Sequence, residues 1–319
     1  MKTKTFIYNV GCMILLTLIA LFSNCKKEGN SSENSYRIVS LSDYTDNVAD
    51  YISTFKYDGE HLTEIYSVDI EMDNDSSKTL ITYPDGQNVI STDYYKDMGQ
   101  WVEDYRNEMV FEGDLLISST SSSFYDGYWE PFWRIINSYE DGKKTNTITY
   151  IYDSGEWYQF VKNVIEYNDN KITQKIVHLF DTDWVQYYKY VYNYSGDNLT
   201  SIVSYTCEAG VYLEDYKEVM TYNGSQVVKY EVYYFEDGMW ISDDSPVSFT
   251  YDEFGNVLSY NYDEFSSEKE VFTYEKGVGN ALQVYFDPNG QFDYIPMPTK
   301  SDQIMKFQKN IPEMHVRIR

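Results

Sequence analysis

Six aromatic residues recur at nearly constant spacing, and they are the residues of this chain best suited to bind a ligand. They follow one another with a period of about 28 residues. Rings on every second strand of a sheet would lie about 9.6 Å apart, comparable to one disaccharide unit, so a glycan chain could stack along them. The alternative, which we favour, is that the rings pack the sheet and stabilise it. The six are Trp101, Trp129, Trp157, Trp184, Tyr212 and Trp240.

Other kinds of site chemistry have little support in the sequence. There are three His residues in unrelated places, and no phosphate loop, zinc-protease helix, Cys-x-x-Cys pair or Ser nucleophile elbow. The acidic stretch from Asp69 to Asp75 departs from a calcium loop, because Asn74 and Leu80 replace its Gly and Glu. Carboxylate pairs are expected by chance among 51 acids. We expect no catalytic residue, no metal and no cofactor, with a carbohydrate-active hydrolase as the alternative.

The composition describes a folded protein with an acidic exterior. The chain has 319 residues with 51 Asp and Glu against 25 Lys and Arg, a formal net charge of −26. Its 35 Tyr, 16 Phe and 6 Trp argue against disorder, because disordered chains are poor in aromatic residues. A surface this acidic repels phosphate backbones, so we exclude nucleic acid as a partner.

The N-terminus predicts where in the cell the protein is located. Lys2 and Lys4 precede an apolar run over residues 10–22, which is too short to span a bilayer and suits a signal-peptide core. The run ends in Leu21-Phe-Ser-Asn-Cys25, which resembles a bacterial lipoprotein signal of the loose type found in the Bacteroidota. That resemblance implies cleavage before Cys25 and attachment of lipid to it. An ordinary secreted protein with a chance Cys is the alternative.

Location and tether follow from the same resemblance. Lys26-Lys27-Glu28 partly resembles the charged signal that directs such lipoproteins to the outer surface. We expect a signal peptide over residues 1–24 and the lipidated Cys with its tether over 25–47. The membrane would then be a partner only through the lipid, at the outer membrane and on the cell surface. A periplasm-facing position is the alternative.

A second series of aromatic residues shows how the first is positioned. Its members are each followed by a turn signal such as Asp-Gly, and they share the period of about 28 residues. Each period therefore holds two turns and two extended runs, which is a β-hairpin. The anchors are Tyr57, Tyr83, Phe111, Tyr139, Tyr167, Tyr194, Tyr222, Tyr251 and Tyr274.

The repeats predict an all-β fold over residues 48–290, an antiparallel up-and-down meander of about eight hairpins and 16 to 18 strands. Strict alternation would place Trp101, Glu103, Tyr105 and Met109 on one face. Because closure removes sheet edges, we expect a large or flattened soluble barrel, with an open twisted sheet as the alternative. Charged residues such as Arg106 on the other face argue against a membrane porin.

The repeat motif carries a further resemblance. Tyr57-Asp-Gly-Glu-His-Leu62 and Tyr194-Ser-Gly-Asp-Asn-Leu199 resemble YD or Rhs-type hairpin repeats. The longer period and the N-terminus look like the uncharacterised Bacteroidota lipoproteins with a porin-like fold. This resemblance implies a fold and no activity. Residues 291–319 break the period and turn basic, which predicts a cap or plug. We expect a non-enzymatic binding or scaffold module, whose partner is a glycan or an envelope protein.

Overall fold

A computed structural model describes residues 36–70, 75–86, 88–113, 115–243, 246–253, 255–261 and 268–276. These residues form 19 strands and no helix, so none of them belongs to a helix with the length and hydropathy of a membrane span. The strands are β1 Tyr36–Thr45, β2 Val48–Asp58, β3 His61–Asp69, β4 Asp75–Thr82, β5 Val89–Asp97, β6 Gln100–Glu112, β7 Leu115–Tyr125, β8 Tyr128–Glu140, β9 Lys143–Asp153, β10 Glu156–Asn168, β11 Lys171–Phe180, β12 Trp184–Ser195, β13 Asn198–Glu208, β14 Val211–Asn223, β15 Gln226–Glu236, β16 Met239–Ser242, β17 Val247–Tyr251, β18 Val257–Asn261 and β19 Lys269–Lys276.

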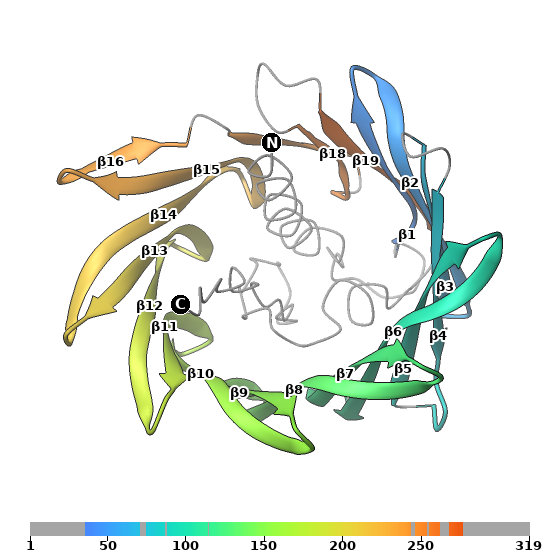
Figure 1. Cartoon of the computed structure of the whole chain (residues 1–319). Coiled ribbons are helices and arrows are strands. Elements are labelled where there is room, and N and C mark those ends of the chain that lie inside the picture. Colours follow the sequence, from blue (N-terminus) through green and yellow to red (C-terminus); the bar gives the residue numbers. More distant parts are fainter. Residues whose placement is uncertain are drawn as a thin grey trace.

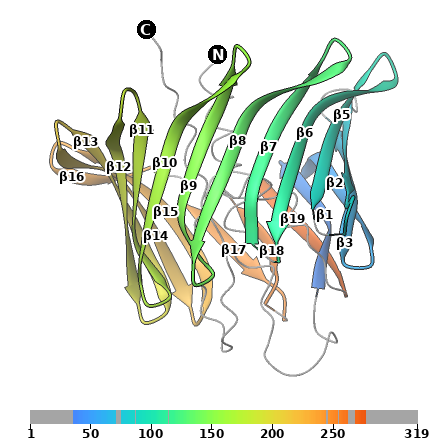
Figure 2. The same cartoon turned by 90° about the horizontal axis from the view of Figure 1, so that it is seen from below.

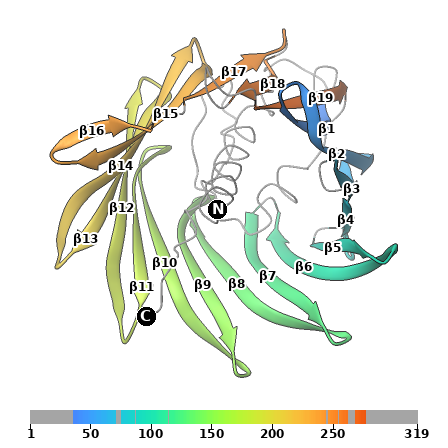
Figure 3. The same cartoon turned by 45° about the horizontal axis from the view of Figure 1, so that its top comes forward.

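The strands form one closed antiparallel barrel, which confirms the predicted meander and excludes the open sheet (Figure 1). Each strand except β16 pairs with the next along the chain, β15 also pairs with β17, and β19 pairs with β1 to close an 18-stranded ring. The short strand β16 pairs only with β15, and Figures 1 and 3 show this hairpin projecting from the ring.

The barrel begins earlier in the chain than we predicted. Strand β1 lies within the range 25–47 that we assigned to the tether, so the barrel begins at Tyr36 rather than at residue 48. The predicted signal peptide 1–24, the lipidation site Cys25 and the C-terminal segment 291–319 lie outside the described residues.

The barrel has two distinct ends. We call the end with the turns at Gly99, Gly127, Gly155, Gly210 and Gly238 the Trp end, and the opposite end, with the turn at Gly59, the Tyr end. At Asp126-Gly127 both residues have positive φ, 51° and 86°, which matches a two-residue type I′ hairpin turn. Figure 1 shows the long hairpins from β5 to β16 splaying outward, and Figure 2 shows their strands tilted relative to the barrel axis.

The inner wall carries the core. Leu62, Ile135 and Ile172 are completely buried. The convex side of a single-layer barrel cannot bury side chains this way, because nothing packs over it, so these residues face inward. A layer of small polar residues lies among them and pairs internally. Ser121 Oγ donates to Asn107 Oδ1 at 2.6 Å, for example.

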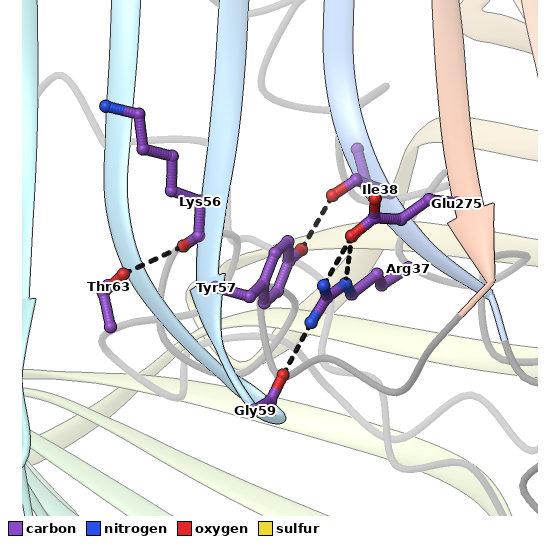
Figure 4. Close-up of polar contacts among 7 residues, drawn as sticks. All are labelled: Arg37, Ile38, Lys56, Tyr57, Gly59, Thr63 and Glu275. Carbon is purple, nitrogen blue, oxygen red and sulfur yellow. Dashed lines mark hydrogen bonds and ion pairs between the residues drawn. The ribbon is translucent and has the colours of Figure 1, made fainter.

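The Tyr anchors cross-link neighbouring strands near the Tyr end. The Tyr57 hydroxyl donates to the Ile38 carbonyl at 2.8 Å, and Figure 4 shows this contact. Beside it, Arg37 donates to the Gly59 carbonyl and pairs with Glu275 of β19. The same hydroxyl-to-carbonyl bond recurs in later repeats at 2.6 to 2.9 Å, from Tyr83, Tyr139, Tyr167, Tyr222 and Tyr251.

A β-bulge near the Trp end corrects the predicted alternation. Tyr94 pairs with Glu103 while its neighbour Asp93 pairs with Tyr105, so β6 holds one extra residue at Asp104. An extra residue reverses which face the following side chains occupy. Trp101 and Glu103 therefore point outward, whereas the prediction placed them on one face with Tyr105 and Met109. Equivalent bulges occur in β8, β10, β12 and β14.

Candidate binding face

The structure gathers all six predicted aromatic residues on the outer wall, beside the turns of the Trp end. Each is half-buried, so none is a fully buried core residue and none is a fully exposed platform. Four of them pair with an aromatic ring of the preceding strand at centroid distances of 5.0 to 5.1 Å, for example Trp157 with Tyr152. These pairs are the cross-strand packing that stabilises sheets.

Each ring also lies under a cation from the preceding repeat. The cation precedes its ring in the chain and lies two strands away from it in the sheet. We call the six pairs together the cation–aromatic row. They are Lys78 with Trp101 at 4.6 Å, Arg106 with Trp129 at 5.7 Å, Arg134 with Trp157 at 4.2 Å, Lys162 with Trp184 at 4.7 Å, Lys189 with Tyr212 at 4.2 Å and Lys217 with Trp240 at 4.8 Å.

Sequence reasoning missed the cations, although a signal was present. They recur with the same period as the rings, about 28 residues. The series mixes Lys with Arg, so no single residue type repeats and the period is harder to recognise than that of the aromatic rings. In the strands of 13 residues the cation is the seventh, so these side chains lie at mid-height on the wall.

The row is staggered because the strands are tilted. Lys78 pairs through Tyr94 with Glu103, and Arg106 lies three residues further along the same strand β6. Two strands of separation combined with this offset place successive cations roughly 12 Å apart. The spacing is therefore longer than the value of about 9.6 Å expected for unstaggered strands, and it remains comparable to a disaccharide unit.

Most cations of the row are not neutralised by acids. Among the described residues, only Arg106 has a carboxylate within ion-pair distance, Glu108 at 2.8 Å. Arg134 donates its Nε–H to the Thr120 hydroxyl at 3.2 Å. His178 lies beside Lys162, and partial burial together with that charge lowers the pKa of His178. This lowered pKa keeps His178 from adding further positive charge to the row.

The rings have one face occupied by a cation and the rest partly open. A sugar could not stack on the covered face without displacing the Lys or Arg, so contact is left to the exposed edges and to the cations themselves. Gln159 lies level with Arg134 two strands away, across Tyr150, and Gln186 lies level with Lys162 in the same way, across His178. The Tyr212 hydroxyl donates to Gln186 Oε1 at 2.7 Å. Ligand stacking by the six aromatic residues stays a prediction.

A second cluster lies on the inner wall where the ring closes. Asp43 of β1 and Glu270 of β19 are cross-strand partners, and Glu270 is 2% exposed. Burial, helped by the charges of Glu270 and Asp50, raises the pKa of Asp43 to about 8. A carboxyl that keeps its proton near neutral pH is what a hydrolytic acid requires. No group of three His, Cys, Asp or Glu among the described residues is arranged to hold a metal.

Comparison with solved structures returns matches of low sequence identity. A protein of unknown function from Bacteroides fragilis is 16% identical, with a TM-score of 0.33 over 36% of this chain and 91% of that one. A porin-like protein from Bacteroides uniformis is 9% identical, with a TM-score of 0.38 over 75% and 96%. One from Bacteroides vulgatus is 10% identical, with a TM-score of 0.35 over 75% and 98%. No protein-family model and no curated protein matches the chain.

Proposed function

We propose that this protein is a non-enzymatic lipoprotein of the bacterial cell envelope, and that the outer wall of its barrel is a binding surface. The lipid-anchor part rests on the basic start, the short apolar run and Cys25. The binding part rests on the cation–aromatic row, which repeats one chemical unit six times on the outside of the molecule.

One observation favours a lipid-anchored barrel over a membrane-spanning one. The six cations of the row point outward at mid-height, where a spanning barrel would contact the hydrocarbon core. An outward Lys or Arg at the bilayer midplane costs about 2–4 kcal/mol, so six of them would oppose insertion strongly. A wall that stays in water carries no such cost.

The anchor sets the orientation of the barrel. Tyr36 pairs with Lys276, and its neighbour Arg37 bonds to Gly59, so the described chain enters at the Tyr end. Ten residues lie between Cys25 and Tyr36, and these eleven Cα–Cα steps span at most about 40 Å. The Tyr end then faces the membrane, and the splayed hairpins of the Trp end point away from it.

Labelling tests the anchor and the orientation. A fatty-acid probe is expected to label the wild type, and Cys25→Ala is expected to lose both the label and membrane retention. An unlabelled wild type would contradict the anchor. A peptide tag inserted between Asp126 and Gly127, at the Trp end, is expected to bind antibody on intact cells. A tag that becomes accessible only after permeabilisation would place the barrel in the periplasm instead.

A carbohydrate-active hydrolase remains a second candidate because of Asp43 and Glu270. The near-complete burial of Glu270 argues against direct contact with a substrate. Hydrolysis of a glycan by the wild type that is lost in Asp43→Asn, with the fold intact, would favour the hydrolase over the binding module.

A further inference from the structure

We infer that the cation–aromatic row binds a linear anionic polysaccharide, one that carries about one carboxylate or sulfate group per disaccharide. This inference deepens the proposed function, since it rests on the outer wall being the binding surface. It adds the chemical class of the ligand and the residues that would contact it.

The charge state of the row is the first argument. In a chain with 51 acids and 25 bases, each Lys or Arg would easily find a carboxylate. Yet Lys78, Arg134, Lys162, Lys189 and Lys217 have no ion-pair partner among the described residues, and each is half-buried against a ring instead. A half-buried cation without an ion-pair partner can bind an anion strongly, and five such cations in series favour a polyanion.

The acidic net charge does not cancel this local field. Asp126, Asp153 and Asp237 are exposed in the turns of the Trp end. The cations sit mid-strand, about 20 Å along the strand from either end. Exposed charges that far apart are largely screened at physiological salt, where the Debye length is about 8 Å. The six cations therefore form a band on the wall between two acidic rims. Glu103 and Glu214 interrupt this band, level with Lys78 and Lys189, without forming an ion pair with them.

The spacing selects a polysaccharide. Successive cations lie roughly 12 Å apart, so a matching polymer needs widely spaced anions. One acidic sugar per disaccharide meets this need. Nucleic acid carries a phosphate about every 3.4 Å along each strand, and most of its charges would find no cation in the row. The two Gln side chains at the same level, Gln159 and Gln186, can bond sugar hydroxyls between the charged groups.

The ring edges supply the remaining contact. A cation held over one face leaves the outer edge of each indole or phenol half-exposed, beside the place where the anion would bind. Sugar C–H groups can pack on that edge while the carboxylate meets the cation. Five of the six rings are Trp, so binding should change the intrinsic fluorescence of the protein.

The test uses the mature, folded chain and hyaluronan oligosaccharides, which carry one carboxylate per disaccharide. We expect a saturable fluorescence change whose apparent affinity rises with oligosaccharide length until the six units are covered. Raising the salt from about 50 to about 200 mM should weaken binding at least tenfold. Neutral dextran of equal length should not bind.

Two double variants distinguish binding by the cation–aromatic row from attraction by any positive charge on the wall. Lys189→Gln combined with Lys217→Gln is expected to weaken hyaluronan binding at least tenfold. The matched control is Lys56→Gln with Lys229→Gln, which removes two outer-wall cations that already have partners, Glu64 and Glu231. Thermal denaturation checks that both double variants remain folded. Equal losses in the two variants, or tighter binding of poly(dT) than of hyaluronan, would overturn the inference.

The failure of this inference can be told apart from that of the proposed function. If hyaluronan does not bind, but a neutral glycan or a purified envelope protein does and loses affinity in the row variant, the anionic ligand is wrong and the binding surface stands. If neither class of ligand responds to the row variant, the outer wall is not a binding surface and both proposals fail.

Discussion

Removing one ring of the cation–aromatic row should cost a measurable and predictable amount of stability. Trp157 is half-buried, with the Arg134 guanidinium 4.2 Å from its ring centroid and the Tyr152 ring at 5.0 Å. Truncating a fully buried aromatic residue to Ala costs about 3–5 kcal/mol, so half burial contributes roughly 2. The cation adds about 0.5–1 kcal/mol. We therefore expect Trp157→Ala to lower the free energy of unfolding by about 2–3 kcal/mol.

A double-mutant cycle isolates the cation's share. Trp157→Ala, Arg134→Met and the combined variant are unfolded in urea, and the coupling energy between the two sites should be about 0.5–1 kcal/mol. The control cycle joins Trp157→Ala with Arg106→Met. Arg106 lies over Trp129 rather than Trp157, so the control coupling should stay below about 0.5 kcal/mol.

Two outcomes would refute this reasoning. Near-neutral stability of Trp157→Ala, within about 0.5 kcal/mol, would mean that the ring contributes no packing and is an open surface group. Equal coupling in the two cycles would mean that the Arg134 contact does not exist in solution.

Three further predictions concern the inner wall. Tyr222→Phe should cost about 1 kcal/mol because its hydroxyl donates to the Leu199 carbonyl at 2.8 Å. Tyr194→Phe should be neutral or stabilising in the same urea assay, since the buried Tyr194 hydroxyl has no hydrogen-bond partner among the described residues. Asp43 has a folded-state pKa of about 8, raised from 3.8, so the barrel loses stability as the pH rises between these values. The melting temperature of Asp43→Asn should match the wild type near pH 4 and exceed it at pH 8, and a constant difference would contradict the raised pKa.

The period of the repeats determined most of the fold from the sequence. Turn residues at fixed spacing specify hairpins, and a long meander with one apolar face closes because closure buries that face and removes the edges. Strand number and closure could therefore be predicted. The start of the barrel could not, because the turn after β1 is Asp46-Asn47, which lacks the Gly that marks most later turns.

The candidate site was only half visible in the sequence, for a definite physical reason. A bulge adds one residue without altering the repeat period, so counting cannot show that Trp101 and Tyr105 face opposite ways. The pairing of a cation with the ring of the next repeat depends on strand stagger, which is a property of the closed barrel. The regular spacing of Lys78, Arg106 and Arg134 was nevertheless present in the sequence.

Ring closure between β1 and β19 has a consequence for how the chain reaches its native state. The Arg37–Glu275 pair joins residues 238 positions apart, so the last native pairing spans nearly the whole domain. Contacts of such large sequence separation are slow to form, since the intervening chain must order first. Until then the nascent protein exposes two unpaired strand edges, β1 and β19, which could join those of another molecule. We expect refolding at high protein concentration to yield dimers with exchanged terminal strands, and Arg37→Ala to increase their proportion.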